Sequence, residues 1–154
     1  GTITEETVAV EADDCYEVIK VGAKATDDAA IDKATVLVSG GRGVKTEIQL
    51  TQMKELASLL GGQVSGSRPL VESGLLPHSV QIGQSGQTVK PEVMLNIAVS
   101  GAAQYKVGMQ DAKYIISINK DPHAPIFEYS DCAAVADFTT LVPALIAELR
   151  NKRK

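Results

Sequence analysis

Three short apolar segments, each stopped by small or polar residues, constrain most strongly what this chain can fold into. Residues 36–38 stop at Ser39-Gly40-Gly41, residues 94–99 stop at Ser100-Gly101, and residues 114–118 stop at Asn119. Helical patterns lie between these segments, and strands that alternate with helices form parallel sheets. The sequence therefore predicts an α/β fold built on a parallel sheet.

Two helices are predicted from their end signals and from their apolar faces. Thr46 with Gln49 forms a capping box, and Gly61-Gly62 ends the first helix. Its apolar face contains Met53, Leu56, Ala57 and Leu60. The face of the last helix contains Phe138, Leu141, Val142, Leu145 and Leu149. Pro143 is compatible with that helix only if the helix has just begun.

Near-alternating apolar residues at the start of the chain predict a β lead-in over residues 1–28, packed on a domain formed by residues 29–154. The alternating residues are Val8, Val10, Tyr16, Val18 and Val21. Residues 64–91 are rich in Gly, Ser, Gln and Pro and show little periodicity. A loop of that length inside a compact domain is usually functional.

Composition excludes some classes of partner. The chain has 154 residues, of which 44% are hydrophobic, enough for one domain with a proper core. Its net charge of -4 argues against nucleic acid or an anionic membrane as the main partner. No apolar run reaches the length of a membrane span, so we expect a soluble protein without membrane insertion. Cys15 and Cys132 are too few and too far apart for a metal site, and no catalytic residue is assigned.

The breaks after the three apolar segments indicate where a ligand binds. In open parallel sheets, ligands bind beyond the carboxyl ends of the strands, where loops expose backbone N–H groups. Gly41-Arg42-Gly43, Ser100-Gly101 and Asn119-Lys120-Asp121 all follow such ends. Neither a complete G-x-G-x-x-G nor a P-loop G-x-x-x-x-G-K-[ST] is present. The residues alone therefore predict an α/β domain that binds an anionic, hydroxyl-rich cofactor.

Four motifs in fixed order narrow this prediction. They are Ser67-Arg68-Pro69-Leu70-Val71, Gln81-Ile82-Gly83-Gln84-Ser85-Gly86, Ser100-Gly101-Ala102-Ala103-Gln104, and Ile118-Asn119-Lys120-Asp121-Pro122 continuing to Ala124-Pro125-Ile126-Phe127. Together they resemble the C-terminal FAD-binding domain of electron transfer flavoprotein alpha subunits. The resemblance runs from the loop at residues 40–45 to residues 142–145. It implies a Rossmann-like parallel sheet flanked by helices, FAD as the cofactor, and an N-terminal domain of the subunit that is absent here.

The resemblance also implies roles for individual residues. Arg42 would lie against the isoalloxazine ring, where a cation stabilises a reduced, anionic flavin, and Arg68 would do related work. Hydrogen bonds to the cofactor are implied for Ser67, Gln84 and Ser85, with the backbone of Ile82 and Gly83 alongside. The segment Ser100, Gly101, Ala102, Ala103, Gln104 would hold the ribityl and pyrophosphate region. Asn119 matches a further FAD contact, and Asp137 with Phe138 matches a contact at the adenosine end, although Asp137 taken alone reads as a helix N-cap.

The chain departs from the family pattern at two positions that matter. Tyr105 stands where the family usually has a histidine near the pyrimidine carbonyl of the flavin. A phenol can donate one hydrogen bond there but cannot become cationic. Cys132 stands where the family generally has tyrosine after Asp131, a change that concerns local packing more than chemistry.

We expect an electron carrier rather than an enzyme, because the cofactor of such a protein supplies the redox chemistry. The resemblance implies two partners, an electron transfer flavoprotein beta subunit and an acyl-CoA-type or other dehydrogenase. The location would be the cytoplasm of a prokaryote or the mitochondrial matrix of a eukaryote. One alternative is an NAD(H)-using oxidoreductase domain, whose glycine fingerprint is missing. A cofactor-free interaction domain is the other, and the substitution at Tyr105 keeps it open.

Overall fold

The computed structural model describes residues 31–152, together with residues 1, 3 and 4. The alternating stretch from Val8 to Val21 that predicted a β lead-in lies outside the described residues. The described part begins with a 3₁₀ turn, η1 (Ile31–Lys33), whose Ile31 side chain is completely buried.

A parallel sheet of six strands forms the centre of the described part, as the sequence predicted. The strands are β1 (Val36–Gly40), β2 (Gln63–Ser67), β3 (Gln81–Ile82), β4 (Val93–Ile97), β5 (Tyr114–Asn119) and β6 (Cys132–Val135). Their order is β3-β2-β1-β4-β5-β6, and every strand pair is parallel. This is the strand order of dinucleotide-binding sheets, in which the direction of winding reverses between the first and fourth strands.

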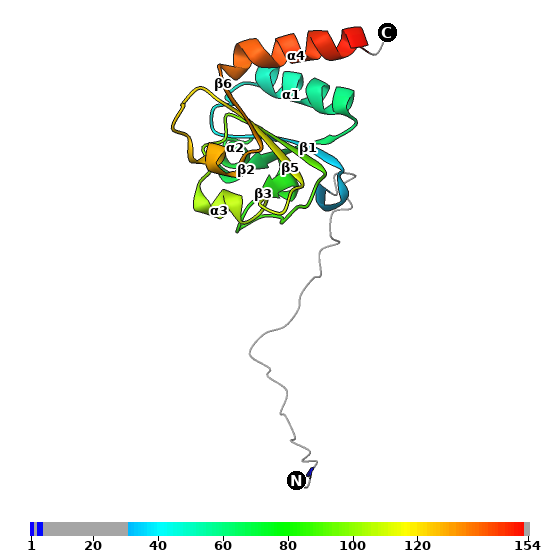
Figure 1. The fold of residues 1–154 in the computed structure, drawn as a ribbon, viewed down its shortest axis with the longest axis vertical. Helices are drawn as coiled ribbons and strands as arrows, with labels where there is room; N and C mark the ends of the chain where they lie inside the picture. Colours follow the sequence, from blue (N-terminus) through cyan, green and yellow to red (C-terminus); the bar gives the residue numbers. More distant parts are fainter. Residues whose placement is uncertain (2, 5–30, 153–154) are drawn as a thin grey trace.

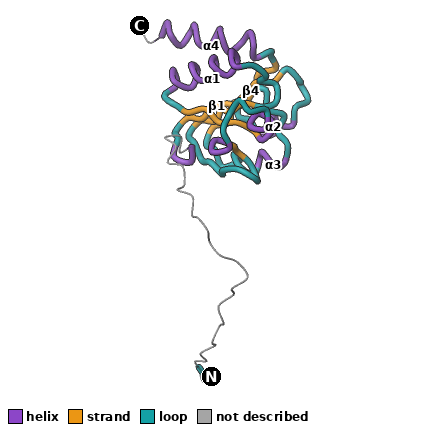
Figure 2. Tube along the Cα trace, turned by 180° about the vertical axis from the view of Figure 1, so that it is seen from behind, coloured by secondary structure: helices purple, strands orange, loops and turns teal. Residues whose placement is uncertain are grey.

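Helices cover both faces of the sheet. They are α1 (Glu47–Leu60), α2 (Arg68–Glu72), α3 (Ala103–Lys106) and α4 (Phe138–Lys152), with further 3₁₀ turns η2 (His78–Val80) and η3 (Pro125–Tyr129). Figures 1 and 2 show α1 and α4 lying together over one face, with α3 on the opposite side. An ion pair between Arg150 of α4 and Glu55 of α1 joins the two long helices at the surface.

The predicted capping box of α1 is confirmed. The Gln49 N–H donates to Thr46 Oγ1 at 3.3 Å, and Gln49 Oε1 accepts from the Thr46 N–H at 3.2 Å. The helix ends at Gly61, which adopts a left-handed conformation with φ 69° that favours glycine. Met53, Leu56 and Ala57 are buried as predicted, whereas Leu60 is only partly buried at the end of the helix.

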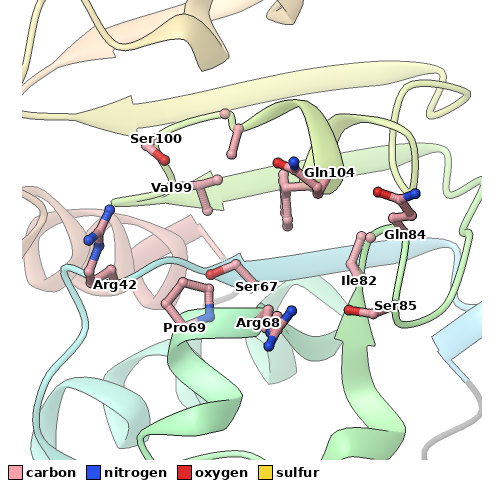
Figure 3. Close-up of a pocket in the computed structure, with 14 residues that line it drawn as sticks. Arg42, Ser67, Arg68, Pro69, Ile82, Gln84, Ser85, Val99, Ser100 and Gln104 are labelled. Atoms are coloured by element: carbon pink, nitrogen blue, oxygen red, sulfur yellow. The ribbon is translucent and has the colours of Figure 1, made fainter.

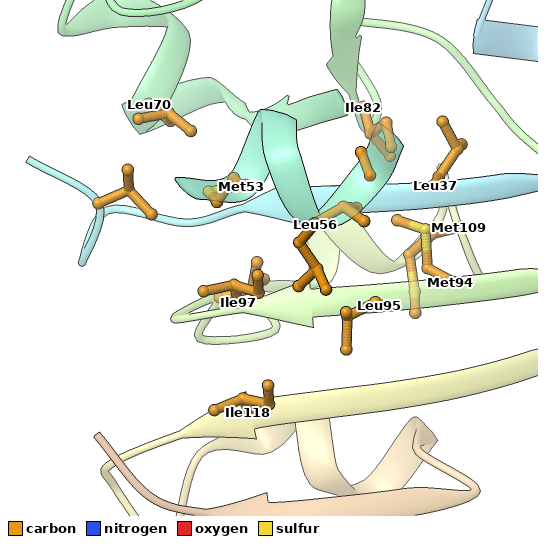
Figure 4. Packing of buried hydrophobic residues seen from close by; sticks show 14 of the residues in the cluster. Leu37, Met53, Leu56, Leu70, Ile82, Met94, Leu95, Ile97, Met109 and Ile118 are labelled. Atoms are coloured by element: carbon orange, nitrogen blue, oxygen red, sulfur yellow. The ribbon is translucent and has the colours of Figure 1, made fainter. Parts of the chain in front are cut away.

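The core forms where α1 and α2 pack on the strands. Figure 4 shows Met53 and Leu56 of α1 and Leu70 of α2 meeting apolar side chains of the sheet. A Cβ atom on Gly40 would lie 2.6 Å from Leu70 Cδ2 and 2.9 Å from Met53 Cε, so a larger residue at the end of β1 would require these two side chains to move.

Two expectations differ from the structure. Residues 64–91 are not one long loop, because they contain most of β2, all of α2, the η2 turn and β3. The reason is that β2 pairs through its backbone between β1 and β3 and has no apolar alternation to reveal it. The last helix begins at Phe138, so Pro143 lies in the second turn rather than at the start. Its missing N–H removes one hydrogen bond of the helix.

Candidate functional site

The site lies where the sheet reverses its winding. At the end of β1, the Gly41 N–H donates to the Ile97 carbonyl of β4 at 2.8 Å, which brings the two loops together. A Cβ atom on Gly41 would overlap the Ala98 carbonyl oxygen, and Ala98 itself has φ 53°. A left-handed alanine is strained and persists only when the surrounding structure holds it. The two loops are therefore packed as tightly as their backbones allow.

A cavity of about 600 Å³ opens beside these loops. Its walls come from the segments that follow β1, β2, β3 and β4, and Figure 3 shows Ser67 and Arg68 on one wall with Ser100 and Gln104 on the other. The lining residues are Arg42, Ser67, Arg68, Pro69, Ile82, Gly83, Gln84, Ser85, Val99, Ser100, Gly101, Ala102, Gln104 and Tyr105. We call this the first cavity. All the residues predicted for the site between Arg42 and Tyr105 line it, except Ala103.

A second cavity of about 490 Å³ continues from the first, and Arg42 and Ser100 line both. It contains the remaining predicted residues, Asn119, Asp137 and Phe138. Its other lining residues are Gly43, Lys45, Gln49, Ala98, Lys120, Asp121, Ala124, Pro125, Ala136 and Thr139. The structure thus brings the predicted residues into two adjoining cavities, with Ala103 lining neither.

Ser67 and Arg68 lie at the start of α2 and differ in burial and in hydrogen bonding. Ser67 is 6% exposed, and its hydroxyl makes no hydrogen bond to the helix it precedes. It is therefore free to bind a ligand in the first cavity. Arg68 Nε pairs with Glu72 Oε1 of the same helix at 2.7 Å, and both side chains are well exposed. Such a surface pair contributes little to stability, but it partly neutralises the charge of Arg68.

The turn after β3 is joined to the first turn of α3. Gly83 has φ 125°, and the next N–H, that of Gln84, donates to the Gln104 carbonyl at 2.8 Å. A Cβ atom on Gly83 would lie 2.7 Å from the same carbonyl oxygen. Beside this turn, the buried Gln81 amide donates to Ser85 Oγ at 3.0 Å, which leaves the Ser85 hydroxyl hydrogen for a ligand. Two motifs that are distant in sequence thus form one wall of the first cavity.

Arg42 is the cation shared by the two cavities. Its side chain is exposed, and within residues 31–152 it forms no ion pair. The loop that carries it has little freedom, because Gly41 and Gly43 both pack against Ala98. A free guanidinium on a rigid loop is well suited to bind an anionic group.

The polar residues of the second cavity hold its loops in place. Asn119 Nδ2 donates to the Val99 carbonyl at 2.8 Å, and Asn119 Oδ1 accepts from the Asp121 N–H at 3.0 Å. Asp137 Oδ1 accepts from the backbone N–H of Thr139 at 2.9 Å and from its hydroxyl at 2.7 Å, which confirms Asp137 as the N-cap of α4. These hydrogen bonds from Thr139 lower the pKa of Asp137, so the carboxylate stays ionised.

Tyr105 directs its hydroxyl into the sheet. The oxygen lies 2.7 Å from both Ser39 Oγ and Asn96 Oδ1, two residues with no exposed surface. The one hydrogen bond that a phenol can donate is therefore given to Asn96 inside the sheet, and not to a group in the first cavity. Burial raises the pKa of the phenol far above its usual value and keeps it neutral.

The fold and the paired cavities define a class of protein, a Rossmann-like domain whose ligand site is a crevice at the reversal of strand order. The family model of the electron transfer flavoprotein FAD-binding domain matches residues 30–110. The chain therefore belongs to the electron transfer flavoprotein alpha family. The family is named for electron transfer by flavoproteins.

Several curated relatives agree with the family model. An electron transfer flavoprotein subunit alpha of Clostridium acetobutylicum is 46% identical over 87% of this chain and 40% of its own length. A mitochondrial subunit alpha of Dictyostelium discoideum is 41% identical over 84% of this chain and 37% of its own length. The LctC subunit of a lactate dehydrogenase (NAD(+),ferredoxin) of Acetobacterium woodii is 41% identical over 96% of this chain and 34% of its own length. The chain spans less than half the length of these relatives.

Sequence reasoning missed part of the second cavity. Lys45, Lys120 and Thr139 line it but were not assigned to the site. Lys120 lies in the stretch Asn119-Lys120-Asp121 at the end of an apolar segment, and Lys45 lies in the loop at residues 40–45 where the resemblance begins, so position in these stretches was the available signal. In the described part of the chain, no helix is both long enough and apolar enough to cross a membrane.

Proposed function

We propose that the two adjoining cavities hold one FAD molecule and that the domain is an electron carrier. The observation that carries this proposal is the junction of the cavities at Arg42 and Ser100, at the point where the sheet reverses its winding. An elongated dinucleotide needs two connected compartments, and crevices of this kind hold dinucleotides in related sheets. We infer that residues 29–154 form this cofactor domain.

The first cavity suits the flavin end. Ile82 and Val99 supply apolar surface for a planar ring, whereas Ser67, Ser85 and Gln84 supply neutral hydrogen-bonding groups at its edge. We assign Ser67, Ser85 and Gln84 to the edge of the isoalloxazine ring. We assign Arg42 to the face or edge of the same ring that gains negative charge on reduction. Arg68 would add a weaker field because Glu72 already pairs with it.

The second cavity suits the phosphates and the adenosine. Lys45 and Lys120 add positive charge beside Arg42, and Asp137 offers an ionised carboxylate that accepts hydrogen bonds from ribose hydroxyls. We assign the backbone from Ser100 to Gln104 to the linking ribityl and pyrophosphate region, and Asn119 and Phe138 to the adenosine end. Ala103 lines neither cavity and would contribute only through its backbone.

When bound, FAD supplies the electron transfer itself, by taking and giving electrons. The side chains described above bind it, orient it and set the charge around it, and we assign none of them to acid, base or nucleophilic chemistry. The domain would therefore not be an enzyme by itself. We propose an electron transfer flavoprotein beta subunit and a dehydrogenase as partners, in the cytoplasm or in the mitochondrial matrix. Relatives with mitochondrial names support the latter for eukaryotes.

The proposal is tested by adding FAD to the purified 154-residue chain and measuring retained flavin absorbance after desalting. We expect a yellow protein with one FAD per chain. NAD(H), added in a parallel sample, is the control for an NAD(H)-using oxidoreductase domain. A folded chain that retains no flavin would contradict the proposal and favour a cofactor-free interaction domain.

A further inference from the structure

A row of polar side chains crosses the buried centre of the sheet. Ser65 of β2 is in register with Ser39 of β1, Ser39 with Asn96 of β4, and Asn96 with Ser117 of β5. Residues in register on neighbouring parallel strands present their side chains on the same face of the sheet. All four side chains have an exposure of 0%. Buried polar groups normally have partners, so their hydrogen bonds can be followed one by one.

Tyr105 connects this row to the first cavity. Asn96 Oδ1 can only accept, so the Tyr105 hydroxyl donates to it at 2.7 Å and accepts from Ser39 Oγ, also at 2.7 Å. The hydroxyl is thus fully engaged inside the sheet. What remains of Tyr105 to face the cavity is its ring and its backbone.

The Asn96 Nδ2 group is connected through two serine hydroxyls to Ile126, which supports the other end of residues 100–105. Asn96 Nδ2 donates to Ser117 Oγ at 3.2 Å, and Ser117 lies 2.7 Å from Ser130 Oγ. Ser130 Oγ in turn donates to the Ile126 carbonyl at 2.9 Å. Each hydroxyl in this series of hydrogen bonds has one hydrogen to donate and one acceptor for it, so the direction of every bond is determined.

Ile126 supports Ser100, the first residue of the segment 100–105, whose last residue is Tyr105. The Ile126 N–H donates to the Ser100 carbonyl at 3.0 Å, and the Ile126 backbone fills the space beside Gly101, where a Cβ atom would overlap it. Residues 100–105 are therefore fixed at Ser100 through Ile126 and at Tyr105 through its hydroxyl. Both attachments lead back to the one amide of Asn96.

We propose that Asn96 is a positioning residue that holds both ends of the cavity segment 100–105, and that the Tyr105 hydroxyl serves this anchor and gives no hydrogen bond to the ligand. This inference rests on the proposed function, since the ligand is taken to be FAD. An amide fits the position because it accepts and donates at once. Asp could not donate, and Leu could do neither.

The test compares Asn96→Ala, Tyr105→Phe and the double variant in the full 154-residue chain. Tyr105→Phe removes a single hydroxyl and is the milder variant should Asn96→Ala fold poorly. Ser65→Ala is the matched control, because Ser65 is equally buried in the same row but its hydroxyl has no hydrogen-bond partner among the described residues.

The FAD dissociation constant is measured per folded molecule by fluorescence quenching. Cofactor-free protein is examined by NMR for the Tyr105 hydroxyl proton and for amide exchange across residues 100–105.

We expect each single variant to weaken FAD binding by roughly three- to tenfold, the size of one net hydrogen bond. The double variant should bind no worse than Asn96→Ala alone, because Asn96→Ala already breaks the link that Tyr105→Phe breaks. Ser65→Ala should bind within about twofold of the parent chain. In the cofactor-free parent the hydroxyl proton should exchange slowly, and in Asn96→Ala this signal should be lost while amides 100–105 exchange faster.

Three results would overturn the proposal. A loss of affinity in Tyr105→Phe but not in Asn96→Ala would mean that the hydroxyl contacts FAD directly. Effects that multiply in the double variant would mean the same. Unchanged affinity and unchanged exchange in both variants would mean that the network only packs the core. If the parent binds no FAD, the proposed function fails, and the exchange data on cofactor-free protein still decide whether Asn96 holds the segment.

Discussion

The two cavities differ in chemistry although they share Arg42 and Ser100. The first contains hydroxyls and amides, Ile82 and Val99 as apolar surface, and Arg68, whose charge is paired with Glu72. Within the described residues, the second adds the charged groups Lys45, Lys120, Asp121 and Asp137. The difference follows from position, because the first lies between the ends of β1, β2, β3 and β4, whereas the second extends toward β5 and the start of α4.

This comparison teaches how one crevice can hold two unlike halves of a cofactor. Neutral groups around a buried ring avoid the cost of desolvating charge, whereas phosphates and ribose are bound by charged groups that stay partly in water. Arg42 lines both cavities, so in the proposed complex it would contact both halves. Changes at the junction should therefore affect both cavities, and changes in one cavity should affect one half of the ligand.

The largest effect is expected at Gly101, where the first cavity rests on the loop before β6. Gly101 has φ 87°, and an added Cβ would overlap the Ile126 backbone. Strain and overpacking each cost about 1–3 kcal/mol, so we expect Gly101→Val to lower the melting temperature of the cofactor-free chain by roughly 10–20 °C. Calorimetry is the measurement, and Ala102→Val, at an exposed neighbour in the same cavity, is the control. Equal melting temperatures for Gly101→Val and the parent chain would mean that the loop moves to accommodate the added side chain.

Arg42→Ala should have the next largest effect and should not distinguish the two halves of the ligand. We expect FAD and FMN affinity to fall by about tenfold or more, because a charge pair at about 4 Å near a protein surface is worth a few kcal/mol before screening. The first one-electron potential of the bound flavin should fall by several tens of millivolts, since about 59 mV corresponds to tenfold for one electron.

Arg68→Ala is the matched control for Arg42→Ala, because Arg68 lines the first cavity but already pairs with Glu72. We expect less than about a threefold change in affinity, with both variants titrated with FAD and FMN and binding followed by fluorescence quenching. Equal effects of the two variants would contradict the special role of Arg42 at the junction.

A smaller and selective effect is expected at Lys120, in the second cavity alone. The parent chain should hold FAD at least about tenfold more tightly than FMN, because only FAD reaches both cavities. Lys120→Ala should weaken the binding of FAD by about threefold, within the range expected for an exposed charge, and leave the affinity for FMN unchanged. Isothermal titration with both flavins measures this, and an equal loss for FMN would mean that the two cavities do not divide the ligand as proposed.

The smallest effect is expected from the titration of Asp137. Hydrogen bonds from Thr139 lower its pKa in the folded chain, so the ionised group stabilises the fold above its unfolded pKa. That stabilisation should be lost as pH falls through the lowered pKa. The melting-temperature difference between the parent and Asp137→Ala should therefore be largest near neutral pH and shrink in acid. Asp137→Asn, which keeps a capping oxygen, should show no such dependence, and a difference that grows in acid would contradict the assignment.

The elements with local signals were predictable from sequence. The capping box at Thr46, the glycine end of α1 at Gly61 and the parallel sheet itself all follow from short-range patterns. The motifs that resemble the family located most of the residues that line the two cavities. Each motif overlaps or follows the end of a strand, and parallel strands end at the same edge of the sheet, so the motifs come together there.

What only the tertiary structure decided are the pairings between segments that are distant in sequence. The strand β2 was missed because its Val64, Ser65 and Gly66 carry no apolar alternation, and its place between β1 and β3 comes from backbone pairing. The direction of the Tyr105 hydroxyl was missed for a similar reason. Its partners Ser39 and Asn96 come from two other strands, and a side chain that can donate to a ligand or to the core is directed by whichever partner lies within reach once the sheet has formed.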